Sequence, residues 1–225
     1  MVKSLGLLLI AATSLLQATY AQEDTAVYED PESGILFNIW PQKFMTFGIA
    51  LPPDGLENNA TEFLGLLTCT SPGGEGVGWC GMSLGGFMPN NLLLMVYPNE
   101  NEVLTSFRWA TKYSPPELYT GDAELTQVSS AINETHYSVI FRCQNCLQWN
   151  QGETSGGAST STGGAMLGWA HAATSPTEGA CPDDAVLERH ENNGLIDAKF
   201  NEQVASSNYE SWAALANSTV PGTCA

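Results

Sequence analysis

Short hydrophobic stretches, separated by polar turns, dominate the pattern along this chain. Nine of them are rich in β-branched, aromatic or leucine residues, which is typical of β-strands. In the stretch 137–143, Ser138 and Ile140 fall on one face of an extended chain, and Val139 and Phe141 fall on the other. We therefore predict strands at 34–40, 45–51, 62–69, 77–84, 92–97, 103–109, 124–129, 137–143 and 165–171.

Turn-forming residues separate these strands, as at 52–55, 71–74, 98–101 and 114–116. Short strands at this spacing predict a single all-β domain, an antiparallel β-sandwich. The low-complexity run 152–164 is expected to be a mobile loop between strands, and a candidate for O-glycosylation. Near the end, one apolar face predicts a short C-terminal amphipathic helix containing Phe200, Val204, Tyr209 and Trp212.

The first 21 residues have the features of a signal peptide. Lys3 precedes an apolar stretch that is too short to span a bilayer, and Ala21 ends a plausible cleavage site. We expect residues 1–21 to be removed, residues 22–216 to form the domain, and residues 217–225 to be a C-terminal tail. The protein is then secreted and extracellular.

Cysteine usage and glycosylation sequons agree with secretion. Six cysteines allow fifteen pairings, of which we expect Cys69–Cys80, Cys143–Cys146 and Cys181–Cys224. Sequons at Asn59, Asn133 and Asn217 mark three expected surface positions for N-glycans.

The formal net charge is −17, and removal of Lys3 with the signal peptide makes it −18. Such a surface repels nucleic acid and anionic membranes, so neither is an expected partner. It also slows association with another acidic protein, an effect that mild acid or added salt relieves.

The segment 81–91 has two chemical interpretations. Gly81–Gly85 fits G-x-S-x-G, the turn that presents a nucleophilic serine, here Ser83, and Asp183 or Asp184 and then His190 follow in the order of a hydrolase triad. That chemistry needs a helix after the serine, whereas another strand-like run follows here. The alternative is Met88, which follows a glycine pair and Phe87 and could present its sulfur to a metal. From the residues alone, a core-filling role is favoured for Met88 over a metal ligand.

The three histidines do not form a zinc or copper pair by spacing. His136 follows a sequon and is expected on the surface, His171 ends a strand, and His190 lies in a polar loop. The expected mature N-terminus is glutamine, which argues against a copper monooxygenase with a terminal histidine ligand. Leu147 after Cys143-Gln-Asn-Cys146 excludes covalent c-type haem attachment, and a local disulfide is the favoured role of that pair.

Several segments together carry a family resemblance. Residues 83–121 resemble the haem-binding cytochrome domain of fungal cellobiose dehydrogenase, a signature shared by related extracellular b-type cytochromes and iron-reductase domains. The most specific matches are Gly-Gly-x-Met-x-Asn-Asn and Arg-Trp-Ala-Thr-x-Tyr in this order. Further matches, at 30–37, 60–65, 141–146, 168–170 and more loosely 188–190, extend the resemblance over residues 28–212.

The resemblance implies an immunoglobulin-like β-sandwich that binds one b-type haem non-covalently. Its axial ligands carry over to Met88 and His190, and Tyr113 matches a family tyrosine near the haem edge. The family's Cys-x-x-Cys disulfide corresponds to Cys143–Cys146, whereas the other four cysteines lie outside the shared pattern. With both axial positions filled, such a haem passes single electrons and leaves no open site for substrate.

The resemblance also implies partners. The expected donor is a flavin dehydrogenase acting in trans or in a longer chain, because no dinucleotide-binding G-x-G-x-x-G follows a strand here. The expected acceptor is a copper polysaccharide monooxygenase or ferric iron, in the setting of lignocellulose degradation, and the protein is expected to be a monomer. Two rival hypotheses stay open: a carbohydrate-binding sandwich without a redox role, and a serine esterase using Ser83.

Overall fold

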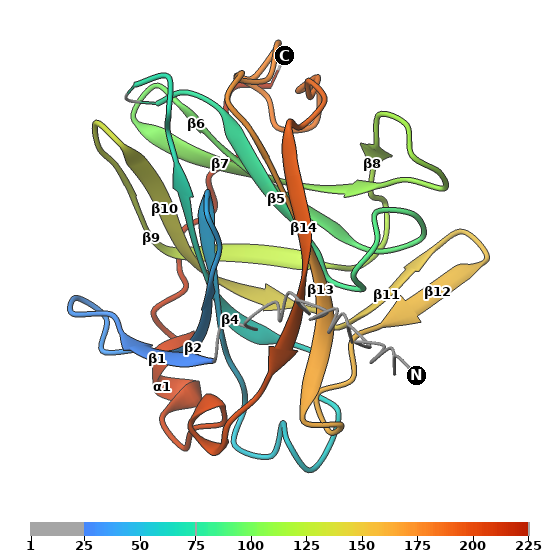
Figure 1. The fold of residues 1–225 in the computed structure, drawn as a ribbon. Coiled ribbons are helices and arrows are strands. Elements are labelled where there is room, and N and C mark those ends of the chain that lie inside the picture. The colour runs from blue at the N-terminus through green and yellow to red at the C-terminus, as the bar shows by residue number, and fades with distance from the viewer. Residues whose placement is uncertain (1–24, 75, 225) are drawn as a thin grey trace, which may run out of the picture.

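The computed structural model describes residues 25–74 and 76–224, so the expected signal peptide lies outside the described residues. It contains two six-stranded antiparallel sheets and a small hairpin (Figure 1). The first sheet has the order β1 (Ala26–Glu29), β2 (Leu36–Pro41), β3 (Met45–Ala50), β4 (Phe63–Thr70), β10 (His136–Gln144) and β9 (Glu124–Ile132).

The second sheet has the order β14 (Asn192–Lys199), β13 (Gly164–Ala172), β5 (Trp79–Ser83), β6 (Leu93–Asn99), β7 (Glu102–Trp109) and β8 (Glu117–Leu118). The hairpin pairs β11 (Gln148–Gln151) with β12 (Thr154–Gly157). The predicted β-sandwich is confirmed, and each of the nine predicted stretches contains a strand. Five strands were not predicted: β1, β8, β11, β12 and β14.

The main core lies between the two sheets. Strand alternation sends Phe47, Leu67 and Phe141 inward from the first sheet, and Leu94 and Leu167 inward from the second. All five side chains are fully buried. Removal of this apolar area from water is the main force that holds the two sheets together.

Three disulfides are present, and their pairs are those expected from the sequence. Cys69–Cys80 joins β4 to β5 and so links the two sheets. Cys143–Cys146 closes the turn after β10, and Cys181–Cys224 ties the connection between β13 and β14 to the C-terminal end of the chain.

The predicted C-terminal helix is shorter than its apolar pattern indicates. A 3₁₀ turn (η1, Glu202–Val204) and a separate helix (α1, Tyr209–Ala213) flank an extended stretch. Backbone hydrogen bonds of Leu51 with Val204 and Ser206 hold that stretch extended. Phe200 and Val204 therefore pack between the sheets, whereas Tyr209 and Trp212 cover the outer face of the first sheet.

The prediction of a loop throughout 152–164 is wrong for part of this segment. Residues 154–157 form β12, and Thr160 beyond it is fully buried. The Thr160 hydroxyl donates to the carbonyl of Gly55 and accepts from the backbone N–H of Ala60 at 2.9 Å. Composition is polar here because the segment satisfies its hydrogen bonds through hydroxyls and backbone rather than through apolar packing.

The helices in the part of the chain that the structure describes are all too short or too polar to cross a bilayer. All three sequon asparagines, Asn59, Asn133 and Asn217, are exposed.

Candidate functional site

Met88 lies in the connection between β5 and β6, of which residues 84–91 are here called the methionine loop. Local contacts hold this loop against the second sheet. Asn91 donates through Nδ2 to the carbonyls of Phe87 at 2.7 Å and Pro89 at 3.1 Å. The backbone N–H of Asn90 donates to Ala110 at 2.7 Å, which ties the loop to the end of β7.

The glycine pair before Met88 allows a close approach to the sheet. Gly86 has a φ of +91°, a conformation that glycine adopts without strain. Its carbonyl oxygen lies where a side chain at Gly168 of β13 would begin, so both positions require glycine. The methionine loop therefore rests directly on β13 at Gly168.

His190 lies in the connection between β13 and β14, residues 173–191, here called the histidine segment. Its ring is half-buried and packs edge-on against Trp79 of β5, with ring centroids 6.2 Å apart. Its Nδ1 lies 3.4 Å from the side-chain amide nitrogen of Asn193 in β14. The indole N–H of Trp79 donates to the carbonyl of Glu188 at 3.1 Å and fixes the backbone just before His190.

The two elements contact neighbouring positions on one face of the second sheet. Gly168 of β13 lies under the methionine loop. Two residues further along β13 is Ala170, which pairs with Asn193 of β14. Residues two apart on a strand share a face and lie about 7 Å apart. That face is the outer one, because Ala170 packs with Trp79 away from the core between the sheets. The loop that carries Met88 and the ring of His190, far apart in sequence, thus contact neighbouring positions on one surface of the sheet.

The surroundings fit a haem. Three large apolar side chains near the methionine loop are exposed: Phe87 at 60 %, Met166 at 46 % and Leu195 at 46 %. Met166 and Leu195 flank Gly168 on the same face, in register with it or two residues away. A cluster of exposed apolar side chains indicates a covering partner, and the flat apolar haem ring is such a partner. Thioether and imidazole are also a known axial pair for haem iron.

The electrostatics of His190 favour a ligand. Burial, and secondarily the charge of Arg189, lower the pKa of His190, against a smaller opposing effect of Glu191. The imidazole is therefore neutral at neutral pH and keeps a free lone pair for a metal. In the described part of the chain, no three or more His, Cys, Asp or Glu side chains are grouped so as to hold a metal ion.

Tyr113 lies in the connection between β7 and β8. It is 75 % exposed and follows Ala110, whose carbonyl accepts from Asn90. The contact between Ala110 and Asn90 ties the chain near Tyr113 to the methionine loop, and a role for Tyr113 at the cofactor stays a prediction.

The geometry removes the hydrolase interpretation of Ser83. This residue ends β5, is 6 % exposed, and its hydroxyl donates to the Phe87 carbonyl at 2.8 Å. A turn and β6 follow it, instead of the helix that a nucleophile elbow needs. The serine helps to fold the methionine loop back over the sheet.

The other two histidines serve elsewhere. His136 is exposed at the start of β10, as predicted. His171 is 1 % exposed, stacks on Phe44 with centroids 4.9 Å apart, and contacts the backbone of Thr70 through Nε2.

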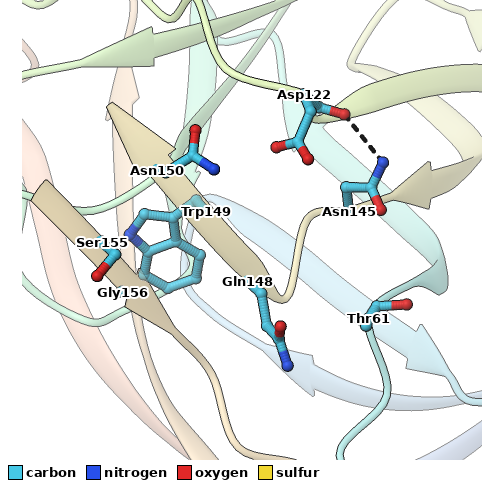
Figure 2. A pocket seen from close by; sticks show the side chains of 8 residues that line it. All are labelled: Thr61, Asp122, Asn145, Gln148, Trp149, Asn150, Ser155 and Gly156. Carbon is cyan, nitrogen blue, oxygen red and sulfur yellow. Dashed lines mark hydrogen bonds between the residues drawn. The ribbon is translucent and has the colours of Figure 1, made fainter. Parts of the chain in front are cut away.

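A pocket of about 440 Å³ lies beside the β11–β12 hairpin (Figure 2). Its lining is mostly amide, hydroxyl and carboxylate groups, and Asn145 donates through Nδ2 to the Asp122 carbonyl at 3.1 Å. The lining residues are Thr61, Asp122, Asn145, Gln148, Trp149, Asn150, Ser155 and Gly156. None supplies a thioether or imidazole, so a haem would find no axial ligand of the expected kind here.

Sequence reasoning missed the residues that position the histidine segment. Arg108 is 6 % exposed and donates through Nη2 to the carbonyls of Pro182 and Ala185. Asn193 belongs to β14, a strand that was not predicted because most side chains on its exposed face are polar. Its signal was the alternation of Ile196 and Ala198, both buried, with exposed neighbours.

Comparisons with known proteins find similar cytochrome domains. The family model of the cytochrome domain of cellobiose dehydrogenase matches residues 28–211. The solved cytochrome domain of Myriococcum thermophilum cellobiose dehydrogenase is 48 % identical, with a TM-score of 0.84, and the match covers 87 % of this chain and 98 % of that one. The cytochrome b domain of pyranose dehydrogenase from Coprinopsis cinerea is 30 % identical, with a TM-score of 0.72 and coverage of 87 % and 97 %.

A full-length relative places this similarity in a larger protein. The pyrroloquinoline quinone-dependent pyranose dehydrogenase of Coprinopsis cinerea is 35 % identical over 182 residues, which are 80 % of this chain. The chain spans about a quarter of the length of that protein, since the match covers 24 % of it.

Proposed function

The chain belongs to the family of cellobiose dehydrogenase cytochrome domains, and from this premise we propose that it binds one b-type haem and relays single electrons. Met88 and His190 are the proposed axial ligands. The observation that carries the proposal is the convergence of their two segments on neighbouring positions of β13 and β14. In this proposal the sheet, and not local structure, brings together two ligands that are 102 positions apart in sequence.

Different residues of the chain have different proposed roles around the cofactor. A haem held by methionine and histidine supplies a reversible one-electron iron couple without an open coordination site. Gly86 and Gly168 bring the methionine loop close to the sheet, and Trp79 and Asn193 orient the His190 ring. Outer contacts of this kind fix the tautomer and orientation of a ligating histidine. Phe87, Met166 and Leu195 exclude water from the cofactor, and Tyr113 lies at its proposed exposed border.

The proposed partners are a sugar dehydrogenase as donor and a copper polysaccharide monooxygenase or ferric iron as acceptor. Support for the donor comes from the relatives, whose names are those of sugar dehydrogenases acting on cellobiose or pyranose. One relative is a quinone-dependent enzyme, so the donor class includes quinone as well as flavin dehydrogenases. We place the protein outside the cell, in keeping with its disulfides and exposed sequons.

An absorption spectrum of the secreted protein, made with ample haem, tests the proposal. After dithionite, a sharp Soret band with resolved α and β bands is expected for low-spin, six-coordinate haem. Met88→Ala and His190→Ala should each convert the reduced spectrum to a five-coordinate form, and His136→Ala, at an exposed site elsewhere, should leave it unchanged. A colourless protein that takes up no added haem would show that the proposal is wrong.

A further inference from the structure

We infer that the C-terminal tail, residues 217–224, is a brace that holds the histidine segment, and with it His190, in its ligating position. The inference rests on the proposed haem function for its consequence, but the brace itself is a property of the apoprotein. Figure 1 shows the C-terminal end of the chain beside the connection between β13 and β14.

The tail is joined to the histidine segment covalently and by close packing. Cys181–Cys224 links residues 43 positions apart. The backbone N–H of Thr223 donates to the Ala180 carbonyl at 2.7 Å. Gly222 has a φ of +67°, and a side chain there would strike the Ala180 carbonyl and the Pro182 ring. The tail therefore packs closely against the middle of the segment, at Ala180 and Pro182.

The tail is itself anchored to the rest of the domain. The backbone of Ser218 makes two hydrogen bonds, of 2.7 and 3.2 Å, with the backbone of Gln127 in strand β9 of the first sheet. Val220 packs on the buried cluster that contains Trp79, Leu104 and Ala185. A covalent link to this tail thus attaches the histidine segment to both sheets of the sandwich.

The histidine segment has little structure of its own to fix it. In residues 173–191 the described backbone forms no helix or strand, and a bridge between Thr177 and Val186 encloses turns at 178–180 and 182–184. Arg108 beneath it donates to two carbonyls, and Glu191 accepts from the N–H of Ala173 at 3.1 Å. The conformation of this segment therefore depends on contacts with residues distant in sequence. Among these contacts, the Cys181–Cys224 disulfide is the covalent one.

Constraint at Cys181 should reach His190 through a short chain of contacts. Ala185 donates its N–H to the Cys181 carbonyl at 3.0 Å, and Val186 is fixed by the bridge to Thr177. Glu188 is then held by Trp79, whose ring also contacts His190. Loss of the Cys181–Cys224 disulfide frees Cys181 from the tail. The residues between Cys181 and His190 should then move more, because each is held through the one before it.

The test compares Cys181→Ser/Cys224→Ser with Cys143→Ser/Cys146→Ser, a matched loss of a disulfide at a site outside the segment. Amide hydrogen exchange of the apoprotein should become at least ten-fold faster in residues 176–191 of the first variant, and stay unchanged in residues 84–91. The control should leave both regions unchanged. Equal acceleration in both regions, or none in 176–191, would overturn the brace.

The haem-loaded protein supplies the second readout, transfer of haem to apomyoglobin. Loss of Cys181–Cys224 should accelerate transfer about ten-fold relative to the control pair, and unchanged transfer despite faster exchange would overturn the role of the brace in ligation. Gly222→Ala, which keeps both cysteines, should shift both quantities in the same direction by a smaller factor, and it provides the test if the double variant fails to fold. If the protein binds no haem, the exchange experiment still decides the brace, and only the proposed function fails.

Discussion

The methionine loop and the histidine segment are positioned by opposite means. The methionine loop spans eight residues between adjacent paired strands and is held by its own side chains and glycines. The histidine segment runs from 173 to 191 and depends on Arg108, Trp79 and the C-terminal tail. One proposed ligand is therefore fixed by local turn chemistry, and the other by tertiary contacts.

The difference predicts how each side of the site fails. A change in the methionine loop should displace Met88 and leave the rest of the domain intact, because its restraints lie within the loop. A change that affects the histidine segment should loosen a longer stretch of chain, since few of its backbone groups are paired within the segment. Local opening of such weakly paired regions occurs at lower free energy than global unfolding.

Arg108→Gln should have the largest effect. Loss of the buried guanidinium leaves the carbonyls of Pro182 and Ala185 without their donor, and hydrogen bonds to charged groups contribute about 1.5–3 kcal/mol each. We expect a loss of about 2–4 kcal/mol in the free energy of unfolding, measured by urea denaturation, with faster hydrogen exchange in 176–191.

Arg142→Gln is the matched control for that variant. Arg142 pairs with Glu62 at 2.8 Å on the first sheet, so its loss should cost stability without a selective effect on the histidine segment. If the two variants changed exchange in 176–191 equally, Arg108 would have no special role there.

Gly168→Ala should disturb the packing of the methionine loop on β13. The new methyl group would meet the Gly86 carbonyl, and such overpacking costs about 1–3 kcal/mol. We expect the reduced haem spectrum to lose its six-coordinate form while exchange in the histidine segment stays unchanged. A six-coordinate spectrum in Gly168→Ala would contradict the close packing of loop and strand.

The same contrast explains how much the sequence could predict. Strands with a clear apolar face, such as β10, follow from alternation, and the glycine pair before Met88 indicates a tight turn. Met88 and His190 as a pair came from family resemblance, since neither residue has metal-ligand spacing. The clamp of Arg108 on Pro182 joins residues 74 positions apart, and no local pattern carries that information.

Asn91→Ala should weaken the methionine loop more mildly. It removes two side-chain hydrogen bonds to the loop carbonyls, and a typical hydrogen bond contributes about 1 kcal/mol net. We expect a loss of about 1 kcal/mol in stability by urea denaturation, and faster binding of carbon monoxide to the reduced haem as Met88 dissociates more readily. Asn150→Ala, an exposed amide of the polar pocket, should change neither quantity. Carbon monoxide binding at the unaltered rate would show that Asn91 does not restrain Met88.

The two segments also differ in charge, and this difference should have the smallest of the predicted effects. The methionine loop has no charged residue, whereas the histidine segment contains Glu178, Asp183, Asp184, Glu188 and Glu191 against Arg189. Oxidation of the reduced protein by anionic ferricyanide should therefore accelerate a few-fold from low to physiological salt, because ions screen the repulsion. Glu178→Gln/Glu188→Gln should reduce this salt dependence, and Glu29→Gln/Glu32→Gln, near β1 on the other sheet, should change it less. Equal effects of the two pairs would mean that net charge alone, and not the acidic side of the proposed site, controls the approach of the acceptor.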